Sequence, residues 1–196
     1  MRTDCPSMSV TGGLEGAVLE VLSGSFTPLS LGAIHRLAAT ASKSGLRKAI
    51  LRLVSNGIID QVPGGYLLNR EHLAISAVLE LASIRSTLFD RIFNEVQGWN
   101  VHIELCGIFG SFARREGDEA SDIDLLVIAD QLPENAIGLL ADRVQRWTGN
   151  ACHVVVLTMQ ELEKVKTKRE PILDSWRQDL IVLSGERSII GASEST

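Results

Sequence analysis

Two aspartates two positions apart, Asp122 and Asp124, have the spacing in this sequence that points most directly to chemistry. They open an apolar run over 122–129 that is expected to form a strand. On a strand, side chains at positions i and i+2 share one face, about 7 Å apart along the chain. Like charges on a half-buried strand repel each other unless a cation joins them. Hard divalent ions such as Mg²⁺ suit carboxylate oxygens and arrive with substrate phosphates. The spacing therefore predicts a metal site that handles phosphate.

A glycine-serine pair lies just ahead of these acids. Gly110 and Ser111 close an apolar run at 101–109, and ten residues separate them from the first acid. A glycine lets backbone N–H groups approach a phosphate, and the serine hydroxyl can donate a hydrogen bond to a phosphate oxygen. Arg114 and Arg115 follow and could neutralise phosphate charge. The stretch therefore predicts metal-assisted nucleotidyl transfer, with Mg²⁺ or Mn²⁺ and a nucleoside triphosphate bound together.

A simpler interpretation of the two acids stays open. Asp122 would cap a turn, and Asp124 would face solvent or an arginine. A lone pair of acids favours this interpretation. The glycine-serine turn and the apolar runs on both sides favour a nucleotide site, or a recent descendant of one.

The same stretch resembles the minimal nucleotidyltransferases of the DNA polymerase β superfamily. The matching residues follow the pattern GSxAR…SDxD and are Gly110, Ser111, Ala113, Arg114, Ser121, Asp122 and Asp124. The resemblance implies an α/β (α+β) fold with a short mixed sheet over residues 99–190. It also implies transfer of a nucleoside monophosphate from a nucleoside triphosphate to a hydroxyl of a protein, nucleic acid or small molecule. Similar minimal transferases serve as antitoxins, so a partner toxin or another protein is among the implied acceptors.

One position departs from this family. The family usually carries a third carboxylate on the next core strand, and His153 stands at that place in the expected strand 152–158. Histidine accepts a proton near neutral pH but is a poor Mg²⁺ ligand. His153 is therefore a candidate catalytic base, with a surface histidine as the alternative, and Glu104 is a candidate substitute for the missing acid. Without a third acid, catalysis would be weak, depend on a partner, or be absent.

The first half of the chain has a different pattern. Apolar residues at helical spacing predict three short helices, at 14–22, 28–39 and 42–56, and Pro63-Gly64-Gly65 predicts a hairpin over 58–69. This order resembles a winged helix-turn-helix over residues 13–70. A long helix from about Arg70 to Gln97 would connect it to the second domain, as a connector over 71–98.

The third of these helices is basic. Its first turns carry small hydroxyl side chains and four cations, with no acid between them: Ser42, Lys43, Ser44, Arg47, Lys48 and Arg52. In helix-turn-helix proteins this end of the helix enters the major groove, so the pattern predicts double-stranded DNA as a partner. A solvated face, or a winged helix that joins proteins, is the alternative. Winged-helix regulators commonly pair on two half-sites, so a homodimer is left open.

Further elements are expected after the acids: a helix at 134–147, helices at 160–168 and 170–177, and a strand at 180–183. A short basic run within them is formed by Lys164, Lys166, Lys168 and Arg169. A solvated helix face is its favoured interpretation, and contact with a triphosphate is the alternative.

Composition sets broader limits. The chain has 196 residues and is 45% hydrophobic and 22% charged, which is typical of globular proteins. No apolar run approaches the roughly 20 residues that cross a bilayer, and the first residues lack an apolar signal sequence, so no membrane partner and a cytoplasmic location are expected. Residues 1–70 carry a net charge of +3 and residues 71–196 a net charge of −8, which hints at separate partners. Residues 1–12 and 191–196 are expected to be a flexible lead-in and a tail.

These features leave three hypotheses. The first is an enzyme that transfers a nucleotide. The second is a DNA-binding regulator whose degenerate second domain senses a nucleotide or holds a partner without catalysis; this combination resembles bacterial nucleotidyltransferase-domain regulators over about residues 14–185. The third is an interaction module in which both domains are relics.

Overall fold

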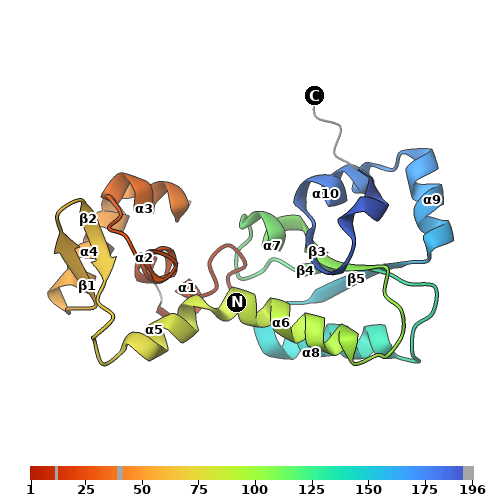
Figure 1. Ribbon diagram of the computed structural model, residues 1–196, viewed down its shortest axis with the longest axis horizontal. Coiled ribbons are helices and arrows are strands. Elements are labelled where there is room, and N and C mark those ends of the chain that lie inside the picture. The colour runs from red at the N-terminus through yellow and green to blue at the C-terminus, as the bar shows by residue number, and fades with distance from the viewer. Residues whose placement is uncertain (12, 39–41, 192–196) are drawn as a thin grey trace. The chain divides into compact units, whose positions relative to one another are not determined.

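The computed structural model describes residues 1–11, 13–38 and 42–191 and divides into two compact units (Figure 1). The N-terminal unit comprises Arg2 and residues 4–86, and the C-terminal unit comprises Met1, Thr3 and residues 87–196. Among the described residues, no helix has the length and apolar character needed to cross a membrane.

The N-terminal unit consists of helices followed by a small hairpin and one more helix. Its elements are α1 (Met8–Thr11), α2 (Leu14–Ser23), α3 (Leu31–Leu37), α4 (Lys43–Ser55), β1 (Ile59–Val62), β2 (Gly65–Leu68) and α5 (Ile75–Ala82). The strands pair antiparallel. A core of buried side chains joins α2, α3 and α4 to the hairpin and α5, and includes Leu22, Ile34, Leu46 and Ile59.

Local signals set the ends of α4. The Ser42 hydroxyl accepts a hydrogen bond from the Gly45 backbone N–H at 3.1 Å, as expected of a helix N-cap. At the other end, Gly57 has a φ of +70°, a conformation that glycine adopts without strain. The stripe Leu46, Ala49 and Ile50 is buried, so the opposite face of the helix is directed to solvent.

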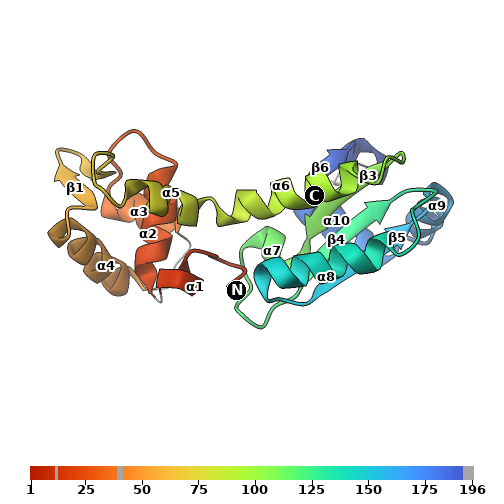
Figure 2. The same cartoon turned by 90° about the horizontal axis from the view of Figure 1, so that it is seen from below.

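The C-terminal unit is built on a four-stranded mixed sheet (Figure 2). Its strands are β3 (Leu105–Phe109), β4 (Ile123–Ile128), β5 (Cys152–Leu157) and β6 (Ile181–Gly185), in the order β5-β4-β3-β6. β3 pairs antiparallel with β4 and β6, whereas β4 and β5 run parallel. The mixed α/β fold with a short sheet that the sequence predicts is confirmed.

Helices cover both faces of this sheet (Figure 2). One face is covered by α6 (Ile84–Gln97) and α8 (Ala136–Thr148). The other is covered by α9 (Met159–Lys168), α10 (Pro171–Asp179) and the 3₁₀ helix η1 (Arg187–Ile190). Because β4 lies inside the sheet and is covered on both sides, it is an almost continuous apolar run. Asp124 is its only residue that is not buried.

The expected connector helix differs from the sequence-based expectation at two places. In place of one helix from about Arg70 to Gln97, the structure has α5 and α6, with Ser83 between them. The Ser83 hydroxyl donates to the Glu80 carbonyl at 2.8 Å, a local bond that competes with the helix ladder. Ahead of α5, the His72 ring accepts a hydrogen bond from the Ala74 N–H, which keeps this stretch out of the helix.

The first residues make defined contacts rather than forming a free lead-in. Thr3 donates from both its N–H and its hydroxyl to the Asp118 carbonyl, each at 3.3 Å, and is fully buried. Residue 12 and the expected tail beyond Gly191 lie outside the described residues.

Candidate nucleotide and metal site

The glycine-serine pair lies at the end of β3, where it begins a short helix, α7 (Gly110–Arg114). Gly110 has a φ of +72°, and a Cβ atom at this position would lie 2.5 Å from Asp124 Oδ2. Both the backbone conformation and the lack of space therefore require glycine here. The absence of a side chain brings the backbone at Gly110 against the Asp124 carboxylate, with Ser111 next in the chain.

Strand register brings three of the predicted residues together. Antiparallel pairing sets Phe109 opposite Asp124, so Gly110 follows directly beside this acid. Parallel pairing sets His153 of β5 opposite Asp124 from the other side. His153 Nδ1 lies 3.5 Å from Asp122 Oδ2 and 3.9 Å from Asp124 Oδ1. The two acids thus flank one imidazole at the same edge of the sheet.

The electrostatics of this cluster are balanced between burial and neighbouring charge. Burial raises the pKa of Asp124 above its ordinary value of 3.8, and the charge of Asp122 raises this pKa further. His153 and Arg114 act in the opposite direction and lower the pKa of Asp124. The Asp122 and Asp124 side chains are 43% and 31% exposed, so solvent reaches both. The carboxylates are therefore open to a ligand.

Arg114, the last residue of α7, is held by two carboxylates. Its Nε donates to Glu116 at 2.7 Å, and its Nη1 donates to Asp179 at 2.5 Å. These two hydrogen bonds, to Glu116 first and then to Asp179, raise the pKa of the guanidinium. Arg115 follows at a φ of +60°, in the left-handed region, with its side chain exposed.

Glu104 is not brought to the site. It precedes β3 and donates its N–H to the Ile128 carbonyl, at the end of β4 opposite to Asp124. Along the strands this separation is roughly 17 Å, at about 3.4 Å per residue. Its carboxylate pairs with His102 at 3.1 Å. Geometry therefore gives no support to Glu104 as the substitute for the third acid.

A buried asparagine, not singled out by the sequence analysis, fixes the loop before the acids. Asn150 is 3% exposed, and its Nδ2 donates to the carbonyls of Ser121 at 2.8 Å, Met1 at 3.0 Å and Glu119 at 3.2 Å. Ser121 immediately precedes Asp122 in the chain. The signal in the sequence is weak, because an asparagine after a glycine at a helix end is also an ordinary loop residue.

The donors present at the site determine whether a divalent ion fits there. No group of three or more histidine, cysteine or acidic side chains among the described residues could hold a metal ion. His153 lies near both acids, but imidazole is a poor ligand for Mg²⁺. Mg²⁺ is commonly bound by one or two carboxylates, with phosphates and waters as the other ligands. Asp122 and Asp124 fit this mode, in which the nucleotide supplies part of the coordination shell.

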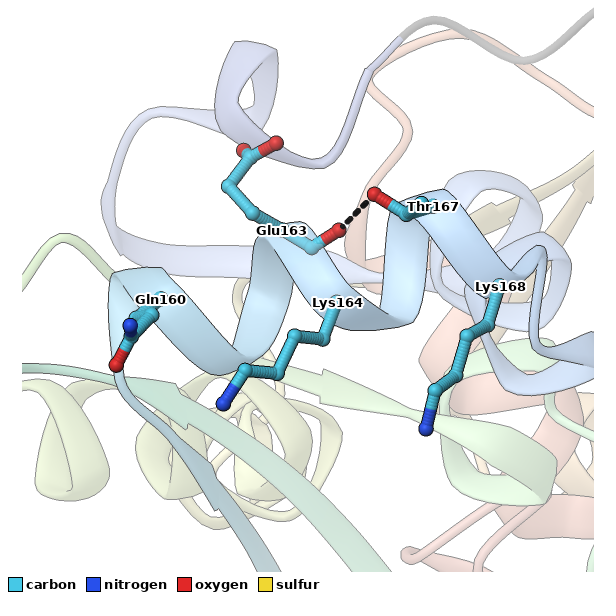
Figure 3. Close-up of a pocket in the computed structure, with 5 residues that line it drawn as sticks. All are labelled: Gln160, Glu163, Lys164, Thr167 and Lys168. Carbon is cyan, nitrogen blue, oxygen red and sulfur yellow. Dashed lines mark hydrogen bonds between the residues drawn. The ribbon is translucent and has the colours of Figure 1, made fainter.

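The basic run on α9 belongs to another part of the C-terminal unit. A shallow hollow of about 320 Å³ lies along one side of this helix and is lined by Gln160, Glu163, Lys164, Thr167 and Lys168 (Figure 3). In Figure 3 the two lysines extend from the same side of the helix. α9 begins beyond the last residue of β5, whereas His153 lies near the start of that strand. Lys166 pairs with Glu163 at 2.6 Å. The run is a largely exposed helix face.

The predicted DNA-binding residues lie on α4 of the N-terminal unit. Five of them are exposed, at the N-cap and in the first two turns of the helix: Ser42, Lys43, Ser44, Arg47 and Lys48. Arg52 is exposed as well but forms an ion pair with Glu15 of α2, so the Glu15 carboxylate partly neutralises its charge. Leu51, 49% exposed, also lies on the solvent side of α4.

Comparison with known proteins finds a family match over part of the chain. Residues 92–173 match the profile of the family "Polymerase beta, Nucleotidyltransferase". No curated protein sequence matches the chain significantly.

Three toxin–antitoxin complexes are among the solved structures that match part of the chain. A toxin–antitoxin structure with AMP-PNP is 18% identical, with 52% of this chain and 77% of that chain covered and a TM-score of 0.39. A mutant MntA–HpeT complex is 16% identical, with 52% and 76% covered and a TM-score of 0.38. A tri-AMPylated Shewanella oneidensis HEPN toxin in complex with MNT antitoxin is 17% identical, with 53% and 74% covered and a TM-score of 0.36.

Proposed function

We propose that this chain, whose residues 92–173 form a nucleotidyltransferase domain of the polymerase β family, transfers a nucleoside monophosphate from a nucleoside triphosphate to a hydroxyl acceptor. The observation that carries the proposal is the strand register, which sets Asp124 of β4 between His153 of β5 and the end of β3, where Gly110 follows, with Asp122 close to the same imidazole. Glycine exposes its backbone next to the Asp124 carboxylate, where backbone N–H groups can meet a phosphate, and the acids offer oxygen ligands to a cation.

Each side chain has a role that its position supports. Asp122 and Asp124 would hold the divalent cation, which when bound neutralises phosphate charge. The Ser111 hydroxyl donates to a phosphate oxygen, and Arg114 offers its N–H groups to the same triphosphate. His153 accepts the proton of the acceptor hydroxyl, because imidazole can take a proton near neutral pH. The acceptor oxygen then bonds to the α-phosphorus, the bond between this phosphorus and its bridging oxygen breaks, and pyrophosphate leaves.

A label-transfer experiment tests this function. The full chain is incubated with each of the four α-³²P-labelled ribonucleoside triphosphates, Mg²⁺ or Mn²⁺, and extract as a source of protein and nucleic-acid acceptors. We expect label in an acceptor with wild type and its loss in Asp122→Asn and Asp124→Asn, because each removes one anionic oxygen ligand. Glu104→Gln is the matched control, since it removes a carboxylate from the far end of the same sheet and leaves transfer unchanged.

Two outcomes would contradict the enzyme assignment. One is the absence of label transfer together with the absence of nucleotide binding by calorimetry. The other is label transfer that survives in both aspartate variants. Binding without transfer would instead favour a domain that senses nucleotide without catalysis.

We also propose that the N-terminal unit binds double-stranded DNA as a winged helix-turn-helix. The specific observation is the exposed side of α4, where Lys43, Arg47 and Lys48 lie beyond the N-cap Ser42. The order of three helices and a hairpin is that of a winged helix. The turn of this hairpin, Pro63-Gly64, carries no cation, so phosphate contacts would come from α4.

Salt dependence tests the second proposal. If three cations each contact a phosphate, the logarithm of the association constant falls against the logarithm of salt concentration with a slope of about −2.7. Binding is measured to DNA from upstream of the protein's own gene. For the triple variant Lys43→Gln, Arg47→Gln, Lys48→Gln, we expect the association constant to depend much less on salt concentration than it does for wild type. Arg52→Gln is the comparison, and its effect should be smaller because Glu15 already pairs with Arg52. Equal binding by the triple variant and wild type would rule out this face.

A further inference from the structure

Arg114 has a second, distant support that the family pattern does not contain. Asp179 at the end of α10 accepts a hydrogen bond from its Nη1 at 2.5 Å, although the two residues are 65 positions apart in the chain. The Asp179 side chain is only 7% exposed, whereas Glu116, the other partner of this guanidinium, is 63% exposed. Asp179 therefore provides the buried contact, and Glu116 the exposed one. Asp179 also lies outside residues 92–173, the segment that matches the family profile.

The position of Asp179 is itself fixed by packing. Trp176, one turn earlier on α10, is 1% exposed and meets the Phe109 ring edge-to-face, with centroids 6.1 Å apart. Phe109 directly precedes Gly110. One helix thus holds the start of α7 through an aromatic contact and its end through an ion pair. A carboxylate in the last turn of a helix is disfavoured by the helix dipole, so its place in α10 needs a cationic partner.

This contact fixes the guanidinium near the acids. Arg114 lies close enough to Asp124 for its charge to lower the pKa of that acid. The bonds to Glu116 and Asp179 use two of the five N–H groups of an arginine. The others can meet phosphate oxygens. Fixing a free arginine side chain costs about 2 kcal/mol in rotamer entropy. Because the contact with Asp179 already orders Arg114, nucleotide binding has a smaller entropy cost.

We propose that Asp179 is a positioning residue of the nucleotide site, which holds Arg114 in place for the triphosphate. This inference rests on the proposed nucleotidyltransferase function. A competing physical effect makes it testable: a buried carboxylate near a triphosphate also repels it. If positioning dominates, removing Asp179 weakens nucleotide binding; if repulsion dominates, removing it strengthens binding.

A double-mutant cycle separates these cases in the full chain. Dissociation constants for mant-ATP and mant-GTP with Mn²⁺ are measured for wild type, Asp179→Ala, Arg114→Ala and the double variant. We expect Asp179→Ala to weaken binding about tenfold, the size of one hydrogen bond to a charged group. In the Arg114→Ala background it should have no further effect, because Asp179 acts through that arginine. A merely structural residue would weaken binding equally in both backgrounds.

Conservative variants complete the design. Asp179→Asn keeps an oxygen that can accept from Nη1, so we expect a change below about threefold. Glu116→Gln is the matched control on the same guanidinium, and its exposed position predicts a change below about twofold. The cycle is repeated with Asp179→Ser, which introduces a small polar side chain. This variant provides the test if Asp179→Ala fails to fold.

The outcomes distinguish this inference from the function on which it rests. Tighter binding in Asp179→Ala and Asp179→Asn, or an equal loss in both backgrounds, would overturn the positioning role and leave the nucleotidyltransferase proposal intact. Unchanged binding in Asp179→Ala would do the same. Failure of the wild-type chain to bind either nucleotide with Mn²⁺ would overturn both proposals together.

Discussion

Replacing Gly110 with alanine tests whether the close approach of the β3 end to Asp124 makes the site. Two glycines of the C-terminal unit have nearly the same backbone conformation but different surroundings. Gly110 has a φ of +72° and would place a Cβ 2.5 Å from Asp124 Oδ2, whereas Gly149 has a φ of +78° and would place its Cβ in open space. Gly149→Ala therefore measures the cost of the backbone conformation, and Gly110→Ala adds the displacement of the acid.

The expected magnitudes follow from these geometries. The left-handed conformation costs an alanine roughly 1–2 kcal/mol, so both variants should lose about that much stability. In Gly110→Ala the 2.5 Å contact must also be relieved, and the end of the Asp124 side chain is the group that can move. An off-rotamer side chain costs about 0.5–1.5 kcal/mol, which brings the expected loss to roughly 1.5–3.5 kcal/mol. Gly138→Ala, inside α8 with open space around it, should gain about 0.5–1 kcal/mol.

Urea unfolding followed by tryptophan fluorescence is the assay for stability. All three tryptophans, Trp99, Trp147 and Trp176, belong to the C-terminal unit, so the signal reports this unit alone. Binding of mant-ATP or mant-GTP with Mn²⁺ is then measured for each variant under conditions in which it is folded. Only Gly110→Ala should lose affinity, because only this change moves a carboxylate of the site.

One result would refute this reasoning. If Gly110→Ala and Gly149→Ala lose equal stability and both bind nucleotide as wild type does, the contact between Gly110 and Asp124 has no role in the site. Loss of binding in Gly149→Ala as well would show that general destabilisation, rather than the position of the acid, controls affinity.

Two further predictions concern the acid and its loop. Because the folded-state pKa of Asp124 is raised above 3.8, the folded chain holds this proton more tightly, and stability falls as pH rises through the raised pKa. Asp124→Asn should therefore stabilise the cation-free C-terminal unit at pH 7, as measured by urea unfolding. This gain in stability should vanish below pH 3.8. A variant less stable than wild type at pH 7 would contradict the burial argument. Asn150→Ala should destabilise the same unit by about 2 kcal/mol, because three main-chain carbonyls lose their donor. Asn94→Ala, at an exposed position, is the control, and its stability should stay within about 0.5 kcal/mol of wild type. Equal losses of stability in Asn150→Ala and Asn94→Ala would show that the Asn150 hydrogen bonds contribute little.

Features that depend on local chemistry were predictable from the sequence. A helix N-cap needs only a hydroxyl at the right place, and Ser42 caps α4 as expected. A glycine with positive φ ends the same helix at Gly57. Apolar runs gave the order and type of β3, β4 and β5, because strands covered on both faces have few polar residues. The placement of the glycine-serine pair beside Asp124 follows from antiparallel pairing of consecutive strands.

Other features depend on contacts between distant segments and have weak local signals. Asp179 lies far along the chain from Arg114, and only its unfavourable place at a helix end hints at a partner. Asn150 looks like a loop residue until its carbonyl partners are known. Glu104 is a different case: it precedes β3 and Gly110 follows it, so the two lie at opposite ends of one strand. Strand geometry alone could have excluded Glu104 from the site.

The structure also changes the physical argument about the acid pair. From sequence alone, Asp122 and Asp124 are expected to tolerate each other through a bound cation, yet both side chains are partly exposed and both lie within 4 Å of His153 Nδ1. Solvent and a nearby imidazole already reduce their repulsion, so the pair by itself does not require a metal. A ligand is better supported by the close approach of the bare Gly110 backbone to the Asp124 carboxylate, in a conformation that other residues adopt only at a cost. A chain that needed only a stable turn there could use an ordinary residue, whereas a site for phosphate needs the backbone without a side chain.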